Sequence, residues 1–95
     1  MQVLQGCESV KEKMVLINLR KAYGEVRYDA RVPFSALVPG LRLTLPLACS
    51  EDKTPLKTSC VVRHVHYAHH WIRVEFQAAG KKFYECVKFV EEGEE

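Results

Sequence analysis

Leu41-Arg42-Leu43-Thr44-Leu45-Pro46-Leu47-Ala48 is a stretch in which leucine occupies every second position. Successive side chains of a strand point to opposite faces, so this two-residue period predicts a half-buried β-strand. Two further strand-like runs follow at residues 58–67 and 71–76, separated by a short polar break. Closely spaced strands with short connections predict a meander of antiparallel strands in the second half of the chain.

The composition indicates one small folded domain. A chain of 95 residues can bury a single modest core, and 47% hydrophobic with 27% charged residues is ordinary for such a domain. The net charge of +2 is too small to indicate nucleic-acid binding by itself. No apolar run reaches the roughly 18 to 20 residues of a membrane span, and the first residues do not resemble a signal peptide. A cytoplasmic location is therefore expected.

The four cysteines do not form a recognisable framework. Cys7, Cys49, Cys60 and Cys86 are widely spread and include no CxxC pair. Neither a zinc knuckle nor a compact disulfide pattern is indicated. Free and mostly buried thiols are expected instead.

The first half of the chain adds three candidate strands, at residues 1–5, 13–17 and 25–32. Prolines bracket residues 34–38, which favours a connection or a single helical turn there. The polar residues 50–55 predict a hairpin loop after the leucine-rich strand. Six strands are thus expected.

The end of the chain carries a helix-like pattern. Phe83, Val87 and Val90 lie at i, i+4 and i+7, the apolar stripe of a short helix. We therefore expect one domain over residues 1–95, with a barrel at about 1–77, a C-terminal helix at about 80–91 and a solvated acidic tail at 92–95. The fold class is all-β with a C-terminal helix, a six-stranded antiparallel β-barrel.

Histidines form the sharpest candidate for a metal site. His64 and His66 would share one face of a strand, with His69 and His70 in the following turn. No acidic residue lies within this cluster and no cysteine follows ligand spacing. Surface histidines are the expected outcome, with no metal or other cofactor.

Catalytic motifs do not emerge from the sequence. Cys60 and His64 are the one tempting pair of nucleophile and base, but four residues apart on a strand they are too distant for a hydrogen bond. A core cysteine is the better interpretation of Cys60. No GxSxG, P-loop, dinucleotide fingerprint or HExxH occurs, so the protein is not expected to be an enzyme.

A succession of short motifs resembles the bacterial PilZ domain. These motifs are Pro39-Gly40-Leu41-Arg42-Leu43-Thr44-Leu45, then Cys60-Val61-Val62-Arg63, then Ile72-Arg73-Val74-Glu75-Phe76, similar to the family's PG-x-x-V, VVR and GVxF. The resemblance covers residues 14–90. It implies a six-stranded barrel with a C-terminal helix, in a family that typically binds cyclic di-GMP.

The ligand signature of that family is altered in this chain. Its [D/N]xSxxG turn would fall on residues 18–23, where Asn18 matches but Arg20 and Tyr23 replace the serine and the glycine. The upstream RxxxR pair is absent, although Arg27 and Arg31 have that spacing downstream. The resemblance therefore implies a degenerate site without the usual binding of cyclic di-GMP. Under the alternative of a cyclic di-GMP receptor, Asn18, Arg20, Arg27 and Arg31 would bind the ligand.

A second alternative is a small barrel that binds nucleic acid. Its residues would be exposed arginines and aromatics, namely Arg42, Arg63, Arg73, Tyr67 and Trp71. Arginines that alternate with core residues are equally typical of the outer face of any half-buried strand. Nucleic acid is thus the less favoured partner.

The favoured hypothesis is a non-catalytic PilZ-like module of bacterial signalling or motility. By resemblance to atypical members, it would act through protein–protein interaction in a motility, type IV pilus or envelope-regulation pathway. Tyr23 and Trp71 are the candidate aromatic anchors for the partner.

Overall fold

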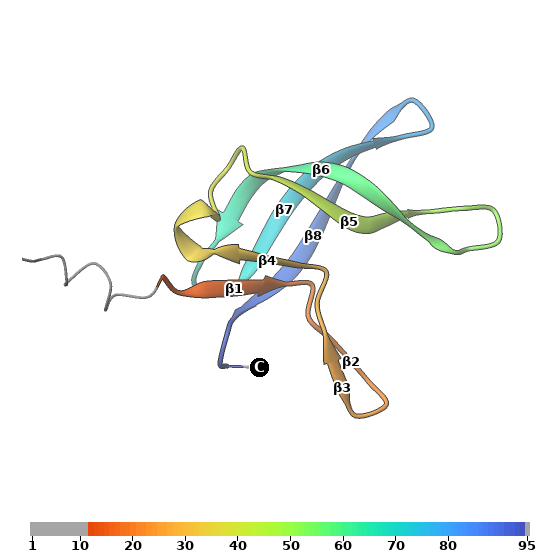
Figure 1. Ribbon diagram of the computed structural model, residues 1–95. Helices are drawn as coiled ribbons and strands as arrows, with labels where there is room; N and C mark the ends of the chain where they lie inside the picture. The colour runs from red at the N-terminus through yellow and green to blue at the C-terminus, as the bar shows by residue number, and fades with distance from the viewer. Residues whose placement is uncertain (1–11, 95) are drawn as a thin grey trace, which may run out of the picture.

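The fold is an antiparallel sheet that curls into a nearly closed barrel (Figure 1). The computed structural model describes residues 12–94. Six strands run in the order β4-β1-β8-β7-β6-β5, and β2 and β3 form a separate hairpin. The strands are β1 Met14–Ile17, β2 Arg20–Ala22, β3 Glu25–Arg27, β4 Ala30–Pro33, β5 Arg42–Cys49, β6 Pro55–His66, β7 Trp71–Ala78 and β8 Lys81–Glu91.

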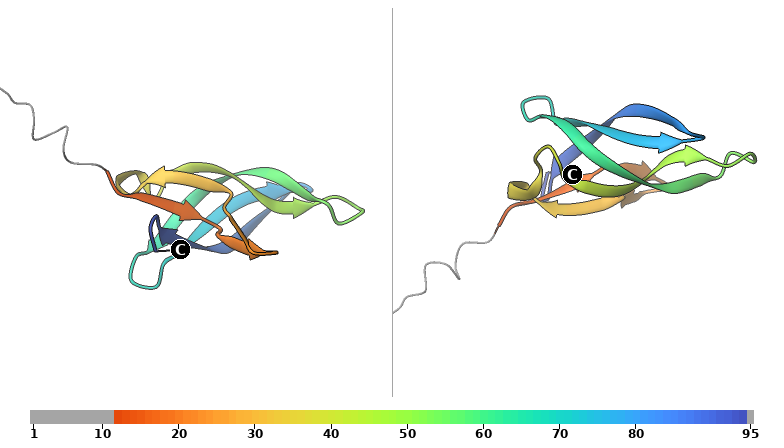
Figure 2. Two further views of the ribbon diagram at one scale, coloured as in Figure 1. Left: turned by 60° about the horizontal axis from the view of Figure 1, so that its bottom comes forward. Right: turned by 90° about the horizontal axis from the view of Figure 1, so that it is seen from above.

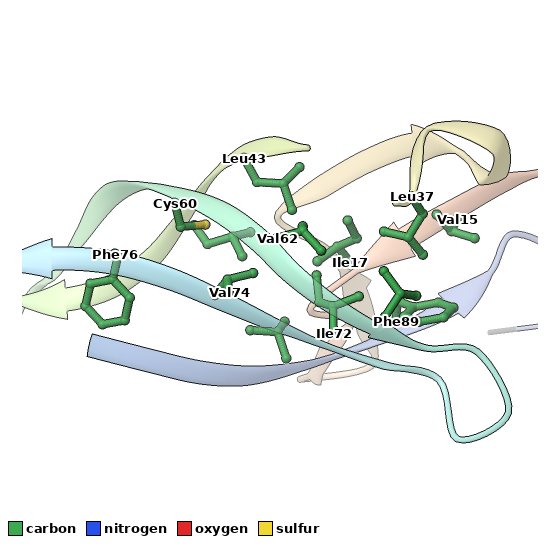
Figure 3. Packing of buried hydrophobic residues seen from close by; sticks show 13 residues of the cluster. Val15, Ile17, Leu37, Leu43, Cys60, Val62, Ile72, Val74, Phe76 and Phe89 are labelled. Carbon is green, nitrogen blue, oxygen red and sulfur yellow. The ribbon is translucent and has the colours of Figure 1, made fainter. Parts of the chain in front are cut away.

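The core lies inside the curled sheet and follows the predicted alternation. Leu43 and Leu45 of the leucine-rich strand are buried, as are the alternate residues of the strands beside it. Figure 3 shows these side chains converging from β1, β5, β6, β7 and β8. Burying one such side chain stabilises the fold by roughly 1.5–3 kcal/mol. The antiparallel meander predicted for the second half of the chain is thus confirmed.

The predicted C-terminal helix at about 80–91 is wrong, because this segment is the strand β8. Ala79 and Gly80 have φ of 54° and 75°, which fits a two-residue hairpin turn from β7 into β8. Val87 and Phe89 are both buried, so the segment alternates with the period of a strand. β8 pairs with β7 on one edge and β1 on the other. Backbone hydrogen bonding along both edges of β8 therefore stabilises the strand more than a three-residue apolar stripe would stabilise a helix.

β8 also changes which strands make up the six-stranded sheet. The candidate strand at residues 1–5 lies outside the described residues, and the sheet has six strands without it. The candidate strand at 25–32 is divided into β3 and β4. β3 pairs with β2, whereas β4 pairs with β1. The number six is therefore right, but its membership differs from the prediction.

The connection between β4 and β5 contains a single helical turn, which is one of the two structures that the prolines favoured. Phe34–Ala36 form one 3-10 turn, η1, and Leu37 after it is fully buried. The hydroxyl of Tyr67 donates a hydrogen bond of 2.7 Å to the Leu37 carbonyl. This contact ties the β6–β7 turn to the η1 connection.

The hairpin loop predicted at residues 50–55 is confirmed between β5 and β6. Asp52 accepts hydrogen bonds from the Ser50 hydroxyl and from the Thr54 amide. These bonds lower the pKa of Asp52. The loop is thus closed by its own side chains.

β5 is an edge strand and contains a proline. β4 and β5 approach each other without forming a ladder, which leaves a seam in the barrel. The Val62 amide donates to the Leu41 carbonyl at 2.8 Å. By the alternation of an antiparallel ladder, the backbone of Pro46 then faces the seam. The register shifts just after Pro46, so a bulge follows it.

Candidate functional site

The β2–β3 hairpin is the most exposed paired element of the described chain. All six of its strand residues are exposed, and it projects away from the barrel (Figure 1). Tyr23 and Gly24 form its turn, with φ of 53° and 80°. The Tyr23 side chain is fully exposed at the tip. The hairpin therefore presents an aromatic ring that contributes nothing to the core.

Asn18 and Arg20, two candidate ligand residues, are brought together by an acid. Asn18 has a φ of 60°, a conformation that asparagine tolerates better than most residues. Its amide donates to Asp29, and the Arg20 guanidinium donates to the other oxygen of the same carboxylate at 2.7 Å. The donor groups of Asn18 and Arg20 that an anionic ligand would need are thus already hydrogen-bonded to Asp29.

Arg27 and Arg31 do not converge with this pair on one ligand site. Arg27 lies opposite Arg20 across the hairpin but forms an ion pair with Glu25 at 3.3 Å. Arg31 lies on β4 and makes two hydrogen bonds of 2.9 Å to Glu92. These bonds raise the pKa of Arg31 and lower that of Glu92.

Trp71 lies within a cluster of histidines at the β6–β7 turn. Its indole stacks on His66 at 5.0 Å between ring centroids and contacts His64 at 5.6 Å. The ring centroid of His69 lies 4.5 Å from that of His66. Trp71 is consequently half-buried, and it offers a partner less free surface than Tyr23 does.

The histidine cluster does not form a metal centre in the described part of the chain. His66 contacts His64 edge on and His69 at a tilt, and His70 stacks instead on Phe89 at 5.2 Å. Within residues 12–94 no group of three His, Cys, Asp or Glu side chains is arranged to hold a metal ion. The Nδ1 atom of His66 is buried without a hydrogen-bond partner.

The residues of the nucleic-acid alternative lie on the neighbouring strands β5, β6 and β7 and in the β6–β7 turn. Arg63 pairs with Glu75 at 3.1 Å, and this ion pair lowers the pKa of Glu75. Tyr67 packs on Phe34 at 5.6 Å, next to the η1 turn. Arg42 lies on β5, whereas Arg73 and Trp71 lie on β7. Arg42, Arg63 and Arg73 are thus exposed on three neighbouring strands, and of these three arginines only Arg63 has an ion-pair partner among residues 12–94.

The cysteine prediction is only partly right. Cys60 is buried in the core, and burial raises the pKa of its thiol. Cys49 and Cys86 are exposed, contrary to the expectation of mostly buried thiols. Cys49 is the last residue of β5, and Cys86 lies next to buried Val87 on β8, so its side chain points to the outer face of the sheet. Cys7 lies outside the described residues.

A cleft that the sequence reasoning missed lies between two diverging hairpins. The β6–β7 ladder ends at Val61 and Glu75, while the β5–β6 and β7–β8 ladders continue to their turns. Figure 2 shows the two hairpins separating beyond this point. The hollow between them measures about 720 Å³. There was little sign of this cleft in the sequence, because Phe83 matched the apolar stripe of a helix and a second hairpin was therefore not expected there.

No helix in the described part of the chain is long and apolar enough to cross a membrane.

Comparison with protein-family models, with curated proteins and with solved structures finds no match to this chain.

Proposed function

We propose that the chain is a non-catalytic β-barrel module that binds another protein through the β2–β3 hairpin. It resembles PilZ domains in its motif order, and we place it with them in bacterial signalling or motility. The observation that carries the proposal is Tyr23, a fully exposed aromatic at the tip of an exposed hairpin.

The backbone at Tyr23 strengthens this argument. A positive φ costs a residue other than glycine roughly 1–2 kcal/mol, and asparagine or glycine is the usual choice for this turn position. Tyrosine therefore stands where local conformational preference disfavours it and where no burial compensates. Residues that break a local rule without a structural gain are expected at functional sites. Tyrosine is also among the residues that dominate binding energy at protein interfaces.

The alternative of a cyclic di-GMP receptor is less well supported. A ligand with two phosphates needs convergent and available guanidinium groups. Arg20, Arg27 and Arg31 instead pair with Asp29, Glu25 and Glu92. We expect no heat of binding when the folded protein is titrated with cyclic di-GMP at near-physiological salt. Micromolar binding that Arg27→Ala or Arg31→Ala removes would establish the receptor function instead.

Photo-crosslinking tests the proposed function. The amino acid p-benzoylphenylalanine would replace Tyr23 in the full chain, expressed in the cells that naturally make it. The matched control carries the same substitution at Lys53, at the tip of the β5–β6 loop. We expect a discrete crosslinked species at position 23 and none at position 53. Equal crosslinking at both positions, or at neither, would contradict the proposal.

A further inference from the structure

The cleft between the diverging hairpins presents two strand edges without a strand partner. Residues 55–60 of β6 and 76–78 of β7 lie beyond the end of the β6–β7 ladder. Each is paired on its other edge, with β5 or β8 respectively. An exposed edge carries backbone N–H and C=O groups that can pair with an added strand. In the described residues, the cleft is thus bounded by two such edges that face each other.

The two sides of the cleft differ in chemistry. Alternation along β6 and β7 places Leu56, Phe76 and Ala78 on the side that continues the inner face of the barrel. A neighbouring hollow on this side is lined also by Leu47 and Phe83. Leu56 and Phe83 are 46% and 41% exposed, so this apolar side is open to solvent.

The outer side of the cleft is polar and carries positive charge. Arg42 and Lys57 both line it, and neither has an ion-pair partner among residues 12–94. Glu75 is the acid that lines the cleft, and it is already paired with Arg63 and Lys82. The available charge of the cleft is therefore positive.

We propose that this cleft binds an extended segment of a partner protein in which apolar and acidic residues alternate. The segment pairs as a strand with the facing edges of β6 and β7, the mode of recognition known as β-augmentation. Its apolar side chains face Leu56 and Ala78, and its carboxylates face Arg42 and Lys57. This inference rests on the proposed function of protein binding, but it concerns a different surface.

Charge selects this occupant over a second copy of the chain. Two copies joined through the same cleft would bring the Arg42 and Lys57 side chains of both molecules together. Like charges in an interface cost several kcal/mol. An acidic strand removes that repulsion and neutralises both cations.

The first measurement uses synthetic peptides of about eight residues, a common strand length, labelled with fluorescein. One alternates Glu and Val, a second alternates Lys and Val, and a third has the composition of the first in two blocks. We expect fluorescence anisotropy to show saturable binding of the alternating acidic peptide only. Binding of the block peptide with equal affinity, or binding of none of the three, would overturn the proposal.

Variants of the full chain localise the binding. Arg42→Glu and Lys57→Glu should each weaken binding of the acidic peptide by at least about tenfold, because each places a like charge beside it. Lys53→Glu is the matched control, since Lys53 lies in the β5–β6 loop and does not line the cleft. Leu56→Asn tests the apolar side without a change of charge. An effect of Lys53→Glu equal to that of Lys57→Glu would reduce the binding to general charge attraction and overturn the proposal.

Amide NMR spectra identify the occupied surface. We expect peptide-induced shifts and new protection from hydrogen exchange in residues 56–61 and 75–79. Shifts confined to the β2–β3 hairpin would overturn the proposal. Protection of the cleft amides before peptide is added would also overturn it, because the occupant would then be the chain's own first residues or a second copy. Sedimentation at several protein concentrations distinguishes these two occupants.

The two proposals fail in different ways. A crosslink at position 23 without peptide binding would support the proposed function and rule out the cleft as a peptide-binding site. Peptide binding without a crosslink at position 23 would support the cleft as a peptide-binding site and rule out the β2–β3 hairpin as the contact surface.

Discussion

The body of the barrel and its splayed end share the four strands β5 to β8, yet they differ in what covers the inner face. In the body, Val62, Ile72 and Phe89 are buried by strands on the opposite side. At the splayed end, Leu56 and Phe83 continue the same alternation but remain exposed. The comparison teaches that alternation selects a face, whereas burial depends on whether another layer lies across from it.

The largest expected difference between the two regions is the cost of removing a phenylalanine. Phe89→Ala should lower the free energy of unfolding by about 3–5 kcal/mol, since Phe89 is only 1% exposed. Phe83→Ala should cost only about 1–2 kcal/mol, because the ring it removes is partly exposed and stacks on Phe76 alone among the aromatic rings of residues 12–94. Urea denaturation followed by circular dichroism measures both. Equal costs would show that the splayed end is covered in solution.

The next largest difference concerns thiol reactivity. With Cys7 and Cys86 replaced by serine, Cys49 and Cys60 can be compared in one protein. Cys49 is exposed at the splayed end, whereas Cys60 is buried and has a raised thiol pKa. We expect a thiol-specific disulfide reagent to modify Cys49 at least about 100-fold faster, because Cys60 reacts only after an opening of the core. Similar rates would contradict the burial of Cys60.

Hydrogen exchange along a single strand gives a smaller contrast. Val61 and Val62 of β6 have backbone partners on both edges, whereas residues 55–60 have a partner on one side only. The first group should exchange more slowly, at rates set by larger opening free energies. Native-state exchange followed by NMR measures this gradient. A uniform rate along β6 would mean that the strand opens as one unit.

The smallest effect is the pH dependence that arises from Glu92. Its hydrogen bonds to Arg31 lower its pKa below the usual 4.5, so the ionised form favours folding. That contribution is present above pH 4.5 and is lost as the pH falls through the lower folded-state pKa. Glu92→Gln should therefore be slightly less stable than the parent at neutral pH and equal to it in strong acid. Because both groups are exposed, added salt should reduce the difference at neutral pH.

The sequence allowed much of the barrel to be predicted, because alternation and turn residues are local signals. The strand at 41–48, the loop at 50–55 and the single helical turn after Pro33 were all readable in this way. β8 was not, because Phe83, Val87 and Val90 match a helical stripe as well as a strand. Only pairing with β1 and β7 decides between these two structures, and pairing is not a local property.

The candidate sites were less accessible to sequence reasoning than the fold. Spacing suggested that Arg27 and Arg31 act together, but Arg27 of β3 pairs with Glu25, whereas Arg31 of β4 pairs with Glu92. The cleft depends on where the β6–β7 ladder stops, and no residue type marks that point. Tyr23 could be proposed as a contact residue because an aromatic residue beside a glycine is visible in the sequence itself.

Pro46 lies on the open edge of β5 at the barrel seam, where it affects how copies of the protein associate at high concentration. The seam side of β5 is an open strand edge, the kind of surface on which proteins stack into fibres. A proline in the middle of that edge has no N–H to donate, and the bulge after it disturbs the spacing that a neighbouring copy would have to match. Replacing Pro46 with valine would restore a continuous edge. Pro46→Val is therefore expected to make edge-to-edge association of copies at the seam easier.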